Sequence, residues 1–254
     1  GIQVPDYLGS KSTFTLGQFG GHGGRALRGG DVLHLAPRAA AGVGAQLPAA
    51  LRTALAQVRT LRVIYGPHGA PEFFTPAYIA TFFATDWEVH FNSSRTGVRL
   101  IGPKPLWARD SGGEAGLHPS NIHDNPYAVG AVDFTGDMPV ILGPDGPSLG
   151  GFVCPVTVIE ADLWQLGQLK AGDKVRFVAV DLPTARRLAQ GRRAELATLS
   201  HQAIAWQPAP LTSPVVMTCG EADKRLVARL SGDTHLLLEA GEPELDLVLR
   251  FRIH

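Results

Sequence analysis

The chain has 254 residues, of which 44% are hydrophobic, and 23 basic side chains balance 23 acidic ones. This length allows one large domain or two small ones, with enough apolar residues for a real core. Because the charge is balanced and the basic residues are scattered, we expect no nucleic-acid partner. No apolar run is long enough to cross a bilayer, so we expect no membrane partner. Two cysteines, Cys154 and Cys219, are too few for a disulfide framework, which favours a reduced, cytoplasmic setting.

Thirty glycines and nineteen prolines predict many short strands joined by turns, with few helices. In chain order, the pattern predicts a strand over Leu61–Tyr65; a helix that starts at Thr75-Pro76 and ends near Ala84; strands over Trp87–Phe91, Val98–Ile101, Met138–Leu142 and Phe152–Ile159; a helix over Glu160–Leu166; a strand over Lys174–Val180; a helix over Pro183–Leu199; and strands over Val215–Thr218, His235–Glu239 and Leu245–Arg252. The first helix has Thr as its cap and Pro at its first position, and Asp181 stands just before the third helix.

Two of these strands alternate clearly. In Lys174–Val180 the apolar residues Val175, Phe177 and Ala179 share one face, and Leu245–Ile253 shows the same period of two. Such alternation is typical of a half-buried antiparallel strand.

A short internal repeat suggests how the chain is divided. The segments 27–33 and 169–175 share the pattern Leu-x-x-Gly-Asp, which predicts a turn followed by a strand that closes a β unit. We therefore expect residues 1–40 to be the end of an upstream β unit and a linker. Residues 41–182 would form a complete β unit, 183–213 a helical and extended linker, and 214–254 the start of a following β domain.

The most polar segment of the chain runs from His118 to Tyr127. Within it, Asn121, Asp124 and Asn125 offer amide donors, amide acceptors and a carboxylate, a set suited to a small planar substrate with N–H and C=O groups. The alternative is an Asx-rich loop whose side chains cap their own backbone. His118 and His123 could bind a metal together with Asp124, but a third ligand at suitable spacing is missing, so we favour hydrogen-bonding roles and expect no metal.

Two further segments carry candidate binding groups. Gly143–Gly151 reads as a glycine-rich loop between strands, with Asp145 and Ser148 at its apex, and its backbone N–H groups could stabilise an oxyanion. It lacks the Gly-Lys-Ser/Thr of a nucleotide-binding loop, and a strained turn is the alternative. In Asn92–Arg99, Arg95 and Arg99 could hold a carboxylate, unless the segment is a solvated hairpin.

Five blocks together resemble the carboxyltransferase domain of urea carboxylase, which also occurs within urea amidolyase. They are Leu8–Thr13, Gly20–Leu27, Asn92–Leu100, Gly113–Asn121 and Gly143–Gly151, and the resemblance extends over essentially the whole chain. It implies a mainly β fold with few short helices, built from cyclophilin-like β-barrel units and truncated at both ends, with the barrel unit at 41–182. The last forty residues resemble the start of the next segment of such enzymes.

The resemblance also implies an activity. In such enzymes ATP and bicarbonate are used at a separate biotin carboxylase domain, a separate carrier domain brings carboxybiotin, and the carboxyltransferase converts urea to allophanate. The biotin carboxylase domain, the carrier domain and the rest of the carboxyltransferase would then be partners of this chain, which we expect to be inactive alone.

The chemistry of that activity makes demands that the candidate residues could meet. The substrate-binding residues would be His118, Asn121, Asp124, Asn125 and Asp145. The residues that face carboxybiotin or its oxyanion would be Arg95, Arg99, Gly146, Ser148, Gly150 and Gly151. Guanidine is an alternative substrate, although Asn121 favours urea, because an Asp there would suit guanidine better. A different alternative is a protein like a 5-oxoprolinase component or a kinase modulator, which acts through partner binding.

Overall fold

The computed structural model describes residues 1–37, 46–52, 55–201, 203–221 and 225–241. The chain divides into two compact units, residues 1–47 and 48–254, and each is described by itself. The predicted strand Leu245–Arg252 lies outside the described residues. No helix in the described part of the chain is long and apolar enough to span a membrane.

The first unit is small and held together by turns. Strand β1 (Thr13–Phe14) pairs antiparallel with β2 (Phe19–Gly20), and a later turn is fixed by Arg25 and Asp31, whose guanidinium and carboxylate lie 2.7 Å apart. That guanidinium and the Arg28 backbone N–H, which also bonds the carboxylate, hold the pKa of Asp31 well below its usual value.

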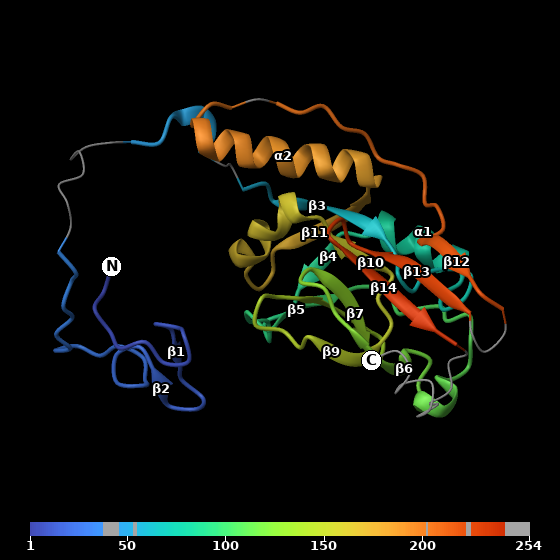
Figure 1. Ribbon diagram of the computed structural model, residues 1–254, viewed down its shortest axis with the longest axis horizontal. Coiled ribbons are helices and arrows are strands. Elements are labelled where there is room, and N and C mark those ends of the chain that lie inside the picture. The colour runs from blue at the N-terminus through green and yellow to red at the C-terminus, as the bar shows by residue number, and fades with distance from the viewer. Residues whose placement is uncertain (38–45, 53–54, 202, 222–224, 242–254) are drawn as a thin grey trace. The chain divides into compact units, whose positions relative to one another are not determined.

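The second unit is built around a closed barrel (Figure 1). Among the described residues, seven strands close it in the order β10-β3-β11-β4-β5-β8-β7. The only parallel neighbours in this ring are β3 and β11. The strands are β3 (Val58–Tyr65), β4 (Trp87–Val89), β5 (Gly97–Ile101), β7 (Ala131–Thr135), β8 (Met138–Leu142), β10 (Val156–Val158) and β11 (Lys174–Ala179).

Helix α1 (Pro76–Ala84) completes the barrel core. Tyr78, Ile79 and Phe82 of this helix are buried in the cluster that fills the barrel, and the ring of Phe82 stacks on that of Phe177 at 4.9 Å. The Thr75 hydroxyl accepts a hydrogen bond from the Tyr78 N–H, which makes Thr75 the N-cap that the sequence predicts. The helix therefore begins where its backbone donors are satisfied and buries its aromatic side chains in the barrel.

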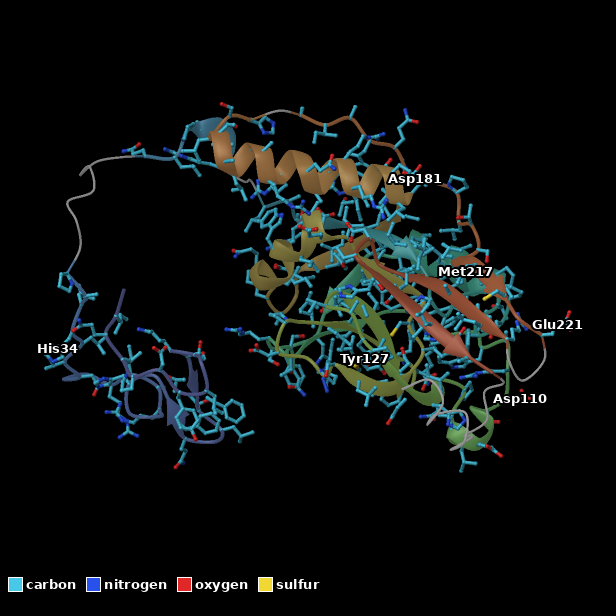
Figure 2. The ribbon with its side chains drawn as sticks, viewed as in Figure 1. His34, Asp110, Tyr127, Asp181, Met217 and Glu221 are labelled. Atoms are coloured by element: carbon cyan, nitrogen blue, oxygen red, sulfur yellow. The ribbon has the colours of Figure 1, made fainter. Side chains whose placement is uncertain are left out.

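Helix α2 (Leu182–Thr198) covers one outer side of the barrel (Figure 1). Its residues Ala185, Leu188 and Ala189 form a second buried cluster with residues of β3 and of the 3-10 helix η3 (Glu160–Gln168). Asp181, marked at the start of the helix in Figure 2, accepts the Thr184 N–H and is the N-cap. The segment predicted as a linker helix thus packs on the barrel. The domain limits at residues 40, 182 and 213 stay predictions.

The remaining elements lie outside the barrel. Strands β12 (Val215–Cys219), β13 (Leu226–Ser231) and β14 (His235–Ala240) form a three-stranded antiparallel sheet, and β6 (Asn121–Pro126) pairs with β9 (Leu149–Phe152). Two further 3-10 turns are η1 (Ala49–Leu51) and η2 (Gly113–Ala115).

The predicted fold class, mainly β with few helices and a barrel, is confirmed, but several details of the prediction are wrong. The expected strand Phe152–Ile159 is interrupted at Cys154-Pro155, because proline cannot donate to the strand ladder. Strand β11 is antiparallel to β4 but parallel to β3, so its alternation does not show a purely antiparallel strand. The prediction also misses β1, β2, β7 and β13.

The internal repeat corresponds to the same turn in both places. The Asp31 N–H donates to the Arg28 carbonyl, and the Arg28 N–H donates to the Asp31 carboxylate. Asp173 makes the same two bonds with Lys170, and a glycine with positive φ precedes each aspartate. The repeated sequence therefore encodes a repeated reciprocal turn, in which glycine supplies the left-handed conformation.

Candidate functional site

The two most polar segments of the sequence form one ribbon. Strand β6 pairs antiparallel with β9, with Asn125 opposite Gly150 and an irregular register between Asn121 and Asn125. The sequence predicts both segments as loops. That prediction is wrong, because Asn121–Pro126 and Leu149–Phe152 are strands. The pairing nevertheless brings together side chains that are about 25 residues apart in the chain.

The ribbon has a solvent face and a covered face. His123 and Asp124 are exposed, whereas Asn125 is only 8% exposed. The Asn125 side-chain amide donates to the Gly150 carbonyl at 3.1 Å, which fixes its orientation. Asp124 is therefore open to solvent and Asn125 is covered, although the irregular register here breaks the simple alternation of a strand, since His123 and Asp124 are adjacent and both exposed.

Asn121 caps a turn at the start of the ribbon. Its side-chain oxygen accepts the His118 N–H at 3.2 Å, and its own N–H donates to the His118 carbonyl at 2.9 Å. The Arg109 guanidinium donates to the Asn121 carbonyl. The capping alternative that the sequence leaves open is thus realised at Asn121 in this structure.

His118 is held by hydrogen bonds. Its Nδ1 accepts the Ser120 N–H at 3.1 Å, which leaves the Nε2 hydrogen to point toward Asp137 Oδ1, 3.5 Å away. The indole N–H of Trp107 donates to the same carboxylate oxygen. No group of three or more metal-binding side chains occurs among the residues that the structure describes.

Arg95 and Asp145 bind each other. Arg95 Nε lies 2.7 Å from Asp145 Oδ2, and the Asp145 N–H donates to the Arg95 carbonyl at 3.4 Å. Both side chains are at least half exposed. The segment around Arg95 therefore lies beside the glycine-rich segment, and a carboxylate ligand would have to compete with Asp145 for Arg95.

The glycine-rich segment uses several polar groups to hold its own shape. The Gly146 N–H donates to the Gly143 carbonyl, and the Ser148 carbonyl accepts the Tyr127 N–H. A Cβ on Gly150 would lie 2.6 Å from the Tyr127 ring, and one on Gly151 would lie 2.7 Å from a β6 carbonyl oxygen. These two glycines let the ribbon strands and Tyr127 approach closely, and the Ser148 side chain is exposed.

Two buried polar residues, Asp133 and Asn125, each leave one oxygen without a partner among the described residues. Asp133 of β7 is only 4% exposed, and burial raises its pKa to about 7, against the opposing effects of Arg99 and the Thr135 hydroxyl. The sequence analysis does not identify Asp133. Its signal is an acid inside the apolar run Ala131–Phe134.

Arg99 faces Asp133. Asp133 and Arg99 both lie opposite Val140 of β8, one from each neighbouring strand, so the three side chains form a row across the outer face of the barrel. Tyr127 and Cys154 lie near Asp133, and burial raises the pKa of both groups. Figure 2 marks Tyr127, whose Oη accepts the Phe152 N–H at 2.7 Å.

The same arrangement of barrel and ribbon belongs to a known family. The family described as "Carboxyltransferase domain, subdomain A and B" matches residues 1–179. The chain belongs to this family. It is 44% identical over its whole length to a urea amidolyase of Lachancea kluyveri. The crystal structure of the Kluyveromyces lactis urea carboxylase superposes on all of this carboxyltransferase chain with a TM-score of 0.89 and 43% identity, and the match covers 24% of that chain.

A more distant relative is a 5-oxoprolinase component of Haemophilus influenzae, which is 29% identical over 74% of the carboxyltransferase chain and 56% of the relative. The chain spans only 15% of the length of the Lachancea urea amidolyase. The matches to urea amidolyase and urea carboxylase therefore establish the family of this chain, and they concern a small part of much larger proteins.

Proposed function

We propose that this chain forms part of the carboxyltransferase centre of a biotin-dependent urea carboxylase, which converts urea to allophanate. The observation that carries the proposal is the whole-chain similarity to urea amidolyase and urea carboxylase, which extends through every polar segment described above. The partners would be a biotin carboxylase domain that uses ATP and bicarbonate, a biotin carrier domain, and the rest of the carboxyltransferase. On this proposal the chain alone does not turn over.

The substrate roles fall on the ribbon. The reaction joins a urea nitrogen to the transferred carboxyl carbon and removes a proton from that nitrogen, so urea must be held by its N–H and C=O groups. Asn121, Asp124 and Asn125 would supply the matching acceptors and donors, with His118 and Asp145 at the edges of the site. Because Asp124 is exposed and Asn125 is buried, they would hold urea together only at the edge of the ribbon.

The residues that would contact carboxybiotin lie in the two segments around Arg95 and Gly143–Gly151. Biotin on the carrier domain would supply the carboxyl group and take up the proton. The exposed donors of Arg95 and Ser148 suit the oxygens of a carboxylated ureido ring. Gly150 and Gly151 would let that ring approach the backbone, Arg99 would add positive charge, and Gly146 would contribute only if its N–H left the Gly143 carbonyl.

Two alternatives are separable from this proposal. Guanidine would bind as a cation and would favour a carboxylate at the position of Asn121. A 5-oxoprolinase-like role, favoured by the 29% identity to the Haemophilus protein, would require no biotinylated partner. Steady-state kinetics with urea and with guanidine separate the first alternative, and dependence on the biotinylated carrier separates the second.

The test uses this chain within a complete carboxylase, together with biotin carboxylase and biotinylated carrier domains. We expect Asn121→Ala and Asp145→Ala to abolish allophanate formation while biotin-dependent ATP cleavage persists. Asp86→Ala is the matched control, because it removes only a surface ion pair with Arg176. Unchanged allophanate formation in both site variants would refute the assigned roles.

A further inference from the structure

His118 and Asp137 lie side by side where the turn between β7 and β8 meets the segment before β6. Nε2 of His118 is 3.5 Å from Oδ1 of Asp137, and the two side chains are 41% and 40% exposed. A hydrogen bond from a ring N–H to a carboxylate oxygen usually spans about 2.7–3.2 Å. The donor and the acceptor are therefore adjacent without being bonded to each other, and both can be reached from solvent.

The other side of the His118 ring is held in place. Its Nδ1 accepts the Ser120 N–H at 3.1 Å and lies 2.9 Å from the hydroxyl of Ser120, which is fully buried. Because an acceptor nitrogen carries no hydrogen, neutral His118 has its hydrogen on Nε2. The His118 N–H donates to Oδ1 of Asn121, a residue of the proposed substrate site. The Nε2–H group is thus a donor with a fixed direction beside that site.

Asp137 is held by a tight turn and by an indole. Gly136 and Asp137 form the two-residue turn between β7 and β8, and Gly136 supplies the positive φ of 64°. Oδ1 of Asp137 accepts the indole N–H of Trp107 at 3.1 Å, and the Trp107 ring stacks on Phe74 of the barrel core at 4.7 Å. Oδ2 lies 3.7 Å from the Lys104 amine, too far for a hydrogen bond. The carboxylate is therefore oriented and can still accept from a ligand.

A neighbouring donor and acceptor match one edge of an amide. Urea carries a C=O and an N–H side by side, so its carbonyl can accept from His118 Nε2–H while its N–H donates to the Asp137 carboxylate. Guanidinium carries N–H groups alone, so at the same edge one of them would meet the Nε2–H, donor against donor. The pair therefore suits a neutral amide better than a guanidinium cation.

We propose that His118 Nε2–H and the Asp137 carboxylate bind the C=O and N–H groups on one edge of the urea substrate. This inference rests on the proposed function and extends it, because it adds Asp137 as a substrate-binding residue and specifies which atom of His118 acts. Ser120 and Trp107 are then positioning residues, since each holds one member of the pair. The pair is also a determinant of urea over guanidine.

The deciding experiment measures KM and kcat for urea in the complete carboxylase. Asp137→Ala removes the acceptor and should raise the KM for urea by about tenfold, while biotin-dependent ATP cleavage without urea is unchanged. Asp86→Ala is the matched control, because it removes a surface aspartate that pairs with Arg176, and it should leave the KM as in the wild type. An unchanged KM in Asp137→Ala overturns the proposal.

His118→Phe is the second variant, since it keeps a ring and removes the donor. It should raise the KM for urea by about tenfold and leave the inhibition constant of guanidinium unchanged or lower, because the repelling N–H is gone. A merely structural role of His118 would weaken both ligands alike, and that result also overturns the proposal. If the wild type forms no allophanate, the proposed function fails, which is a different result from urea turnover that is indifferent to Asp137.

Discussion

Asp133 should make this protein less stable as pH rises through the neutral range. Its usual pKa of 3.8 applies to the unfolded chain, whereas burial raises the folded value to about 7. Between these values the folded state holds a proton that the unfolded state has lost, so the free energy of unfolding falls with rising pH until about 7 and then levels off.

The size of the effect follows from the two pKa values. Between pH 5 and pH 8 the unfolded carboxyl is ionised throughout, and the folded carboxyl resists ionisation over about two pH units, which corresponds to about 3 kcal/mol. Asp133→Asn cannot ionise, so it should lack this loss. The amide group that Asn introduces changes the free energy of unfolding by the same amount at every pH. It therefore does not affect how the difference between the two proteins varies with pH.

The assay is guanidinium chloride unfolding of the wild type and Asp133→Asn, followed by circular dichroism at pH 5, 6, 7 and 8. Other groups titrate in this range, but they are common to both proteins, so the difference between the two curves isolates Asp133. Asp86→Asn, on the surface, should track the wild type. Parallel curves for the wild type and Asp133→Asn would contradict this account, because they would show that Asp133 ionises as easily in the folded state as in the unfolded one.

Three further predictions concern the barrel. His68 is fully buried, accepts the Cys154 N–H and has its pKa lowered to about 3 by burial, so acidification from pH 6.5 to 4.5 should cost about 2 kcal/mol of stability as the unfolded histidine takes up a proton. His68→Asn, whose Oδ1 can accept the same bond, should lose this slope in thermal melts across that pH range. Asp162→Asn should destabilise by about 3–5 kcal/mol, because Asp162 is 1% exposed and binds the Arg62 guanidinium, whereas Asp86→Asn should change stability by less than about 1 kcal/mol in the same denaturant titration. Thr75→Ala should lower stability by about 1 kcal/mol and Thr75→Ser should restore it, since only the hydroxyl caps α1, and equal losses in both variants would contradict the capping role.

Local patterns in the sequence predict the structure correctly where residues adjacent in the chain determine the local conformation. Thr75-Pro76 predicts the start of α1, because a cap and a first-turn proline act on the next few residues. The repeated Gly-Asp turn is likewise encoded within five residues, and both copies adopt it. The strand Met138–Leu142 is predicted with its observed limits, since its apolar run is bounded by turn residues.

The polar ribbon escapes prediction because its structure depends on a distant partner. Asn, Asp and Pro are poor strand formers, so Asn121–Pro126 resembles a loop until β9 supplies its hydrogen-bonding partner. The side chains of Asn121 and Arg95 show the same limit. Each is chemically suited to bind a substrate, yet in the structure Asn121 caps a turn and Arg95 pairs with Asp145, 50 residues away.

The fold class, the helix starts and the repeated turn can all be read from the amino-acid sequence, and its resemblance to known enzymes also predicts the carboxyltransferase family. The conformational preferences of neighbouring residues determine the helix starts and the repeated turn. The occurrence of several motifs together indicates the family. The pairing of the two polar segments into one ribbon emerges only in the folded chain, as does the burial of Asp133 on the outer face of the barrel. Burial and hydrogen-bond satisfaction depend on which distant strands pack together, and a single aspartate in an apolar run does not reveal what will cover it.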